Sequence, residues 1–447
     1  MENIILFLSI FLILPPIILF VLNRKFFYYS LIILYPIVGQ LISVKIELFS
    51  FTINPSMLFG ALVLVMTAID FILYPSKDSV LEIAVVLFVL YSIFTSLFSP
   101  VRFVSLTWSL KIATWLLILL SSIKIFSEEN DLYQIKIAVC FAVIVVLFSF
   151  LFSKLGFYGR SLTYETGVVL HGGGFESGKV FGYYLAMAMP ILIISSSSRN
   201  VFGQLFSTLL ILTSAAVIVL TFVRAPIVAL LIGFTAYQYF SYRYADKKFV
   251  MTAVTIGAIV GLIILVYLLL GDTQVMSRWN ELGNKYSEGK VEKLGSGRVG
   301  IFMSFIEYYF YKAGLIQKIF GSGLGSSIVY LGHDLVIHND FAEILMGCGI
   351  IGFSLYIIIT VRIFKTLIKQ VAGLHSTRMT RHSLLALSNF FIFLSFHLTN
   401  LTSGVFILSM WAIYTGATIG IGRTLLDKKT WQVDQPVKNV SEPGRIG

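Results

Sequence analysis

Long apolar runs separated by short polar breaks cover most of the chain. About 20 mainly apolar residues are needed for an α-helix to cross a bilayer. The pattern predicts thirteen such spans, at residues 3–22, 26–43, 56–74, 80–98, 103–123, 132–152, 178–197, 204–223, 226–243, 249–270, 342–363, 384–401 and 404–422. Twelve is an alternative, because two of the breaks are very short. The predicted fold class is an all-α polytopic membrane protein with about 12–13 transmembrane helices.

Two longer polar stretches interrupt this pattern. Residues 153–177 form a Gly-rich polar loop, and residues 271–341 form the largest segment outside the predicted spans. Within the second stretch, residues 299–320 are rich in Ile, Phe and Tyr but contain charged residues. This mixture favours one or two helices that lie on the membrane or cap the bundle. A loop of this length with its own helices is more often a functional lid than a mere connection.

The spans and loops divide the chain into four regions. Residues 1–152 carry N-terminal transmembrane helices, and the first of these lacks a signal-peptide cleavage site and is expected to be retained. Residues 153–270 carry further transmembrane helices and the Gly-rich external loop, and residues 271–341 form the large periplasmic loop. Residues 342–447 are predicted to hold the C-terminal transmembrane helices and a cytoplasmic tail.

The composition supports a membrane location. Hydrophobic residues make up 57% of the chain and charged residues only 12%, against about 25% charged in soluble domains. This excludes a soluble enzyme, a disordered protein and a nucleic-acid-binding domain. The net charge of +11 is concentrated in regions such as residues 362–383, which contain no acidic residue, whereas residues 271–341 are balanced. Because Lys and Arg accumulate in cytoplasmic loops, residues 362–383 are predicted to be cytoplasmic and the two long polar stretches external.

The common catalytic motifs are missing from the sequence. It contains no Walker A motif, no GxSxG elbow, no HExxH pair and no acidic cluster suited to a divalent metal. Its two cysteines, Cys140 and Cys348, lie in apolar runs without metal-ligand spacing. Neither a metal nor another cofactor is therefore expected. Any chemistry would depend on an activated substrate and on cationic side chains.

His338 is the first candidate for such chemistry, because it stands immediately before a predicted span. A histidine at the mouth of a helix bundle can act as a general base if a hydroxyl group comes within hydrogen-bond reach. Helix starts also commonly carry polar residues for capping. The alternative is that His338 and Asn339 belong to a helix start at which Asp340 is the cap.

Two arginines are candidates for binding an anionic substrate. Arg298 follows Gly-Ser-Gly, and its planar guanidinium suits a phosphate, although an exposed loop arginine is more often only solvated. Arg224 lies between two apolar runs, at the predicted external boundary of the membrane. It could bind a lipid-linked phosphate there, or it could extend its head group to the membrane surface without a binding role.

Other residues give weaker signals. Arg160 and His171 in the Gly-rich loop are candidates for substrate contact. The run Gly321-Ser322-Gly323-Leu324-Gly325 resembles a phosphate-binding loop, but it follows no strand and is predicted to be a turn.

Several further ionisable residues lie in or near predicted spans. Asp70, Glu82 and Lys136 are near span ends and are expected to extend towards the membrane surface. His397 is expected to pack between helices.

In this arrangement the sequence resembles the bacterial O-antigen polymerase and O-antigen ligase superfamily of integral-membrane glycosyltransferases. The similarity is strongest over residues 295–360. It comprises Ser296-Gly297-Arg298, the glycine run at residues 321–325, the segment from His338-Asn339-Asp340 to Leu345, and Gly349-Ile350-Ile351-Gly352. A weaker match covers residues 160–226, and the first 150 residues match only in hydropathy.

The resemblance implies an undecaprenyl-pyrophosphate-linked glycan as the donor, with no metal. It implies that Arg224 and Arg298 hold the pyrophosphate and that His338 activates the acceptor hydroxyl. Arg160, His171, Asn339 and Asp340 are the expected substrate-binding residues. The sequence departs from the family pattern at Val223, where many relatives have Ser, and at Gly178-Lys179, where many have Pro-Asn.

The predicted function is an O-antigen or capsular polysaccharide polymerase in the bacterial inner membrane, with its active site facing the periplasm. A chain-length regulator is an expected partner, by resemblance, alongside membrane lipid and the lipid-linked oligosaccharide. One alternative is a ligase that transfers the finished glycan to lipid A-core. An exporter of the lipid-linked unit and a structural membrane subunit are alternatives from other classes.

Overall fold

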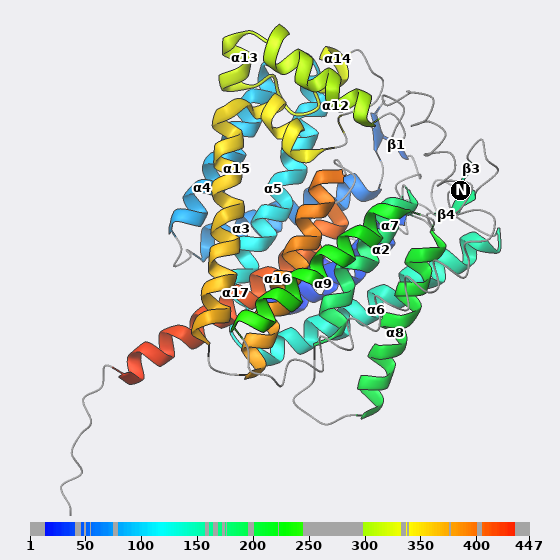
Figure 1. The fold of residues 1–447 in the computed structure, drawn as a ribbon, viewed down its shortest axis with the longest axis vertical. Helices are drawn as coiled ribbons and strands as arrows, with labels where there is room; N and C mark the ends of the chain where they lie inside the picture. The colour runs from blue at the N-terminus through cyan, green and yellow to red at the C-terminus, as the bar shows by residue number, and fades with distance from the viewer. Residues whose placement is uncertain are drawn as a thin grey trace, which may run out of the picture.

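The computed structural model of the protein is built almost entirely of helices (Figure 1). It describes residues 14–40, 46–48, 51–53, 55–74, 79–156, 161–163, 169–171, 175, 177–194, 201–221, 223–244, 298–331, 337, 339–374, 377–399 and 405–433. The long helices in this part of the chain are α2 (Arg24–Gln40), α3 (Pro55–Leu73), α4 (Ser79–Leu97), α5 (Arg102–Ile125), α6 (Glu129–Lys154), α7 (Gly178–Leu192), α8 (Val201–Leu220), α9 (Arg224–Tyr244), α15 (Asp340–Gly373), α16 (Thr377–Thr399) and α17 (Val405–Val433).

Six of these helices, α3, α4, α5, α6, α8 and α15, are long and apolar enough to cross a membrane. The protein is thus a helical, multi-pass membrane protein, as the hydropathy pattern predicts. Eleven of the thirteen predicted spans coincide with a long helix. Residues 249–270 lie outside the described residues, and of the first predicted span only residues 14–22 are described, as helix.

Close packing of α5 against α17 forms the centre of the bundle. Gly416 and Gly420, one helical turn apart on α17, face the α5 backbone. A Cβ atom on Gly416 would lie 2.6 Å from the carbonyl oxygen of Leu119, and one on Gly420 would lie 2.3 Å from that of Ile123. Small residues at this spacing let two helix backbones approach closely. In a membrane, where the hydrophobic effect does not drive helices together, such close packing stabilises their association.

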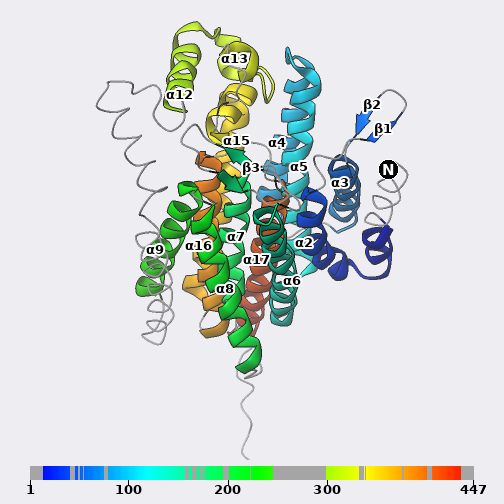
Figure 2. The same ribbon diagram turned by 90° about the vertical axis from the view of Figure 1, so that its right-hand side faces the viewer.

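Three short helices close one end of the bundle, which we call the capped end (Figures 1 and 2). They are α12 (Arg298–Glu307), continued by a π-helical turn at Tyr308–Lys312, α13 (Leu315–Phe320) and α14 (Ser327–Tyr330). Along the first of these segments Ile301, Phe305 and Tyr309 are buried, whereas Phe302 and Phe310 are exposed. The amphipathic stretch at residues 299–320 therefore forms helices that cap the bundle, as predicted.

Helix α15 is not a single straight span. Gly349 has φ +61° and ψ −170°, which breaks the helix after residues 340–348. The rings of Phe341 and Tyr356 lie 5.9 Å apart, although 15 residues of straight helix would separate them by about 22 Å. The first part of α15 therefore folds back beside the second part as a re-entrant half-helix. The predicted span at residues 342–363 is wrong at its start, because hydropathy does not register a reversal within an apolar run.

Ion pairs connect the helices at the end opposite to the cap. Asp70 is buried and pairs with Arg24, and Tyr28 donates a hydrogen bond to it at 3.0 Å. Glu82 and Lys124 pair at 2.9 Å. The expectation that Asp70 and Glu82 extend to the membrane surface is wrong, because a neighbouring helix supplies each carboxylate with a cation inside the bundle.

Two small β-hairpins lie outside the helical bundle. One joins β1 (Ile46–Leu48) to β2 (Phe51–Ile53), and the other joins β3 (Ser161–Thr163) to β4 (Val169–His171), both antiparallel. The second hairpin lies in the Gly-rich loop and pairs Ser161 with His171. Ladders of three residues are too short to leave a recognisable alternating pattern, so the sequence analysis assigned no strand here.

Candidate functional site

The starts of three helices meet the end of a fourth below the cap. α4, α5 and α15 extend further towards the cap than α7, α9 and α16 do (Figures 1 and 2). A Cβ atom on Gly182 of α7 would lie 2.7 Å from Cγ of Pro226, which places the start of α9 against α7. Tyr183 of α7 donates a hydrogen bond to the carbonyl oxygen of Ser395 in α16, at 3.2 Å. The re-entrant half of α15 begins in the same region.

Asp340 and His397 form a buried hydrogen-bonded pair between α15 and α16. Oδ2 of Asp340 contacts Nδ1 of His397, and the two side chains are only 12% and 4% exposed. The charge of Lys179, in the first turn of α7, acts favourably on the same carboxylate, and Lys179 is itself buried. We call Lys179, Asp340 and His397 the Asp340 cluster. The contact of Asp340 with His397 holds the start of α15 to the end of α16.

Aromatic rings enclose the histidine of this cluster. The Phe393 ring centroid lies 4.2 Å from that of His397 in an edge-to-face arrangement, and the centroids of Trp115 and Tyr356 each lie 6.1 Å away. Phe393 also stacks on Trp411 at 3.8 Å. Because these rings exclude water, an unpaired charge here would be costly, and the Asp340–His397 contact is strongly favoured over its separation.

Asn339, rather than Asp340, caps the first turn of α15. Its Oδ1 accepts a hydrogen bond from the backbone N–H of Ala342 at 3.1 Å. Asp340 is the first helical residue, and its side chain turns to His397 instead. The prediction that a helix starts here is therefore confirmed, but the prediction that Asp340 caps it is wrong, because Asn339 is the capping residue. An amide cap leaves the carboxylate available for the buried pair.

Glycines attach the re-entrant half-helix to the cap. Gly323 has φ +85°, and its N–H donates to the carbonyl oxygen of Gly347 at 2.7 Å, a group left unpaired by the break in α15. Gly325 has φ +80°, and its N–H donates to Oε1 of the buried Glu343 at 2.6 Å. The run at residues 321–325 is thus a turn, as predicted. Its left-handed conformations explain the repeated glycines.

Arg224 and Arg298 occupy equivalent positions in two helices. Arg224 is the first residue of α9, and Arg298 is the first residue of α12. The turn before α9 is fixed by Thr221, whose hydroxyl donates to the carbonyl oxygen of Ile218 at 2.6 Å. Unpaired N–H groups at a helix start favour anions.

Of the other predicted site residues, Arg160, His171 and His338 are not described with their side chains. Arg160 and His338 lie outside the described residues, and His338 stands between Ile337, which is buried, and Asn339. The backbone of His171 ends β4. The roles predicted for these residues, and the substrate contacts predicted for Asn339 and Asp340, stay predictions.

Two members of the Asp340 cluster, Lys179 and His397, were not predicted to be site residues. His397 was expected to pack between helices, and it does so, but as the partner of Asp340. Lys179 was noted only as a departure from a family pattern. The available signal was that both are ionisable residues within or beside predicted spans, where such residues face the bundle interior and find partners.

Within the described part of the chain, no group of three or more His, Cys, Asp or Glu side chains could hold a metal ion. The site contains the buried carboxylate of Asp340, on which His397 and Lys179 act. It also contains the starts of α7 and α9, and helix starts favour anions. Such an arrangement can bind a negatively charged group and orient a neighbouring segment.

Fold and site together define a multi-pass helical membrane protein with a re-entrant helix beneath a helical cap. No protein-family model matches the chain, and no curated protein is significantly similar to it.

Proposed function

We propose that the protein is a polysaccharide polymerase of the bacterial inner membrane. It transfers a glycan from undecaprenyl pyrophosphate to a sugar hydroxyl of a lipid-linked repeat unit, at the periplasmic face. The observation that carries the proposal is the meeting of helix starts below the cap. The helix that begins with Arg224 packs against α7, whose Lys179 acts on Asp340, two residues after His338.

In the proposed reaction, the acceptor hydroxyl oxygen attacks the anomeric carbon of the donor sugar. The bond from that carbon to the pyrophosphate oxygen breaks, and undecaprenyl pyrophosphate leaves with the electron pair. Arg224 and Arg298 stabilise the negative charge that develops on the leaving oxygen, since cationic donors fixed in advance favour such a transition state. The proton of the hydroxyl passes to His338, which acts as the general base.

The Asp340 cluster has a positioning role in this proposal. His338 is followed directly by Asn339, which caps the first turn of α15, and by Asp340, the first residue of that helix. The pairing of Asp340 with His397 fixes this helix start. A general base must be held within hydrogen-bond reach of the proton that it removes. The re-entrant half-helix supplies a rigid support for it inside the bundle.

The decisive experiment uses the purified full-length protein in detergent. Undecaprenyl-pyrophosphate-linked repeat units, extracted from cells that lack the protein, are incubated with it in the presence of a chelator. We expect a ladder of longer lipid-linked glycans, lost in Arg224→Ala, Arg298→Ala and His338→Ala. Arg378→Ala is the matched control, because Arg378 lies at the opposite end and approaches Glu129 at 3.7 Å.

Other outcomes of that experiment would replace the proposal. Product that appears only when lipid A-core is added would identify a ligase. Transport of the lipid-linked unit across a vesicle membrane without any joining would identify an exporter. Full activity of the triple variant would reject the roles of these three residues, and absence of both joining and transport by the unaltered protein would leave a structural role.

The orientation has a separate test. The proposal requires the capped end to face the periplasm and residues 362–383 to face the cytoplasm. A reporter enzyme that is active only outside the cytoplasm, fused within residues 362–383, should be inactive. An active fusion at this site would reverse the orientation and reject the periplasmic site.

A further inference from the structure

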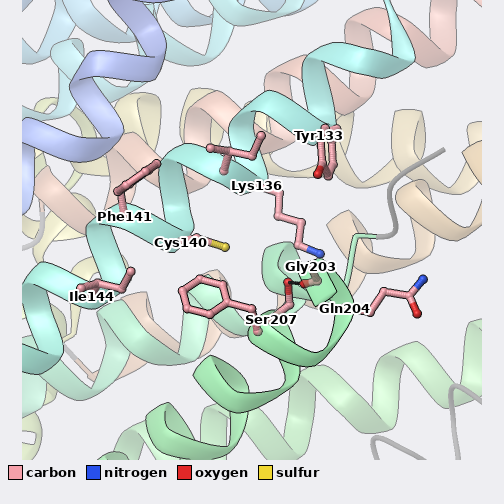
Figure 3. Close-up of a pocket in the computed structure, with 10 residues that line it drawn as sticks. Tyr133, Lys136, Cys140, Phe141, Ile144, Gly203, Gln204 and Ser207 are labelled. Carbon is pink, nitrogen blue, oxygen red and sulfur yellow. Dashed lines mark hydrogen bonds between the residues drawn. The ribbon is translucent and has the colours of Figure 1, made fainter. Parts of the chain in front are cut away.

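A pocket opens on the side of the bundle between α6 and α8 (Figure 3). Its volume is about 220 Å³. Phe141 and Ile144 of α6 and Phe206 of α8 form its apolar wall, and Lys136, Cys140 and Ser207 form a polar edge. This pocket lies apart from the Asp340 cluster, because Lys136 is in the second turn of α6, at the end opposite to the cap.

Lys136 is a buried cation that contributes to this pocket. Its side chain extends from α6 towards Gly203 and Ser207 of α8 (Figure 3). Its Nζ donates a hydrogen bond to the carbonyl oxygen of Ile194, just beyond the end of α7, at 2.6 Å. The prediction that Lys136 extends to the membrane surface is therefore wrong. An ammonium group has three donors, so one hydrogen bond to a carbonyl does not exhaust its capacity.

A second cation acts on Lys136 from α16. The charge of Arg381, in the first turns of α16, acts unfavourably on Lys136. Arg378 lies in the same helical segment, and its described carboxylate partner, Glu129, is 3.7 Å away. Burying a cation near other cations is unfavourable unless an anion offsets the charge. The charge distribution thus favours an anionic ligand in the pocket.

The rest of the pocket is suited to a hydrocarbon chain. Phe141 and Phe206 are 56% and 41% exposed, so the apolar wall is open towards the surroundings of the bundle. Both α6 and α8 are helices that can cross a membrane, and that surface would face lipid. A ligand with a negative head group and an apolar chain matches a cation at one edge and aromatic rings along the wall.

We infer that this pocket binds an anionic phospholipid of the membrane leaflet at the end opposite to the cap. The phosphate lies at Lys136, and an acyl chain lies along Phe141, Ile144 and Phe206. If Lys136 served only to bind the end of α7, the adjoining apolar pocket would be unnecessary. The lipid would lie between α6 and α8, whose residues both line the pocket.

Native mass spectrometry of the delipidated full-length protein tests this inference. Phosphatidylglycerol and phosphatidylcholine of identical acyl chains are titrated separately, and we expect tighter binding of phosphatidylglycerol. Lys136→Gln should weaken that binding about fivefold, which corresponds to about 1 kcal/mol for one cation near an anionic lipid surface. The matched control is Lys154→Gln, which removes the same charge from the other end of α6.

A second variant guards against misfolding of the first. Ile144→Trp leaves Lys136 in place but fills part of the pocket, and it should also weaken phosphatidylglycerol binding. Added phosphatidylglycerol should raise the midpoint of thermal unfolding of the unaltered protein and of Lys154→Gln, because a ligand that binds only the folded state stabilises it. Equal binding of both lipids, or an unchanged affinity in Lys136→Gln and Ile144→Trp, would overturn the inference.

Discussion

Two charged pairs of the protein, Lys25 with Asp131 and Asp340 with His397, are built differently. At the end opposite to the cap, Lys25 pairs with Asp131 at 2.9 Å and is 28% exposed, so water reaches the pair. In the Asp340 cluster, Asp340 and His397 are enclosed by aromatic rings. The first kind of pair joins the ends of neighbouring helices. The second fixes the start of a helix that turns back into the bundle.

This contrast separates pairs that water can reach from pairs that it cannot reach. A pair at a helix end that water reaches can be replaced with little loss, because water compensates for what is removed. An enclosed pair cannot lose one partner without leaving a bare charge among apolar groups.

Removal of His397 should have the largest effect on stability. In His397→Ala, Asp340 loses the partner that contacts it, and breaking a buried pair in this way costs about 3–5 kcal/mol. The free energy of unfolding in detergent, measured with a denaturant, checks this. The double variant Asp340→Asn with His397→Ala should recover part of the loss, because the bare charge is then absent. A loss no larger than in Lys25→Ala would remove the distinction between the two pairs.

Arg298→Lys should remove most of the polymerase activity. Lysine keeps the charge at the start of α12 but lacks the planar fork that binds a pyrophosphate through two parallel hydrogen bonds. Loss of one such donor from a transition-state site lowers the rate about 100-fold or more. The rate of polymer formation by the purified protein measures this, with Arg378→Lys as the control. Near-normal polymer length in Arg298→Lys would refute the pyrophosphate role.

The break in α15 should be sensitive to a single methyl group. In Gly349→Ala, the new Cβ would lie 2.3 Å from the carbonyl oxygen of Ile319, and φ of +61° is itself unfavourable for alanine. We expect a loss of about 1–3 kcal/mol in the free energy of unfolding from backbone strain alone. Gly60→Ala is the matched control, since no atom lies within 4 Å of the added Cβ. Equal stability of the two variants would argue against the re-entrant turn.

The smallest effect is expected on the surface of the cap. Lys312 and Glu307 pair at 2.8 Å but are 64% and 62% exposed. Such a pair contributes at most about 1 kcal/mol, so Lys312→Ala should unfold almost like the unaltered protein. The free energy of unfolding in detergent, measured with a denaturant, checks this. A loss comparable to that of His397→Ala would show that exposure does not separate the ion pairs of this protein.

Much of the fold could be predicted from the sequence, but less of the site. Apolar runs of about 20 residues located eleven of the long helices, because a membrane helix must be apolar along its length. The turn at residues 321–325 was also predicted, since this glycine run follows no strand. The pairing of Asp340 with His397, 57 residues apart, leaves no local signal.

The amino-acid sequence by itself determined that the chain forms apolar helices with an amphipathic segment over one end. These properties follow from the period and length of hydrophobic runs, which act locally. Only the tertiary structure decided that α15 reverses at Gly349, that Asn339 rather than Asp340 caps it, and that Asp70 and Lys136 are held inside the bundle. Asp340, Asp70 and Lys136 each take a partner from a distant part of the chain, because a buried polar group takes whichever partner packing brings within reach.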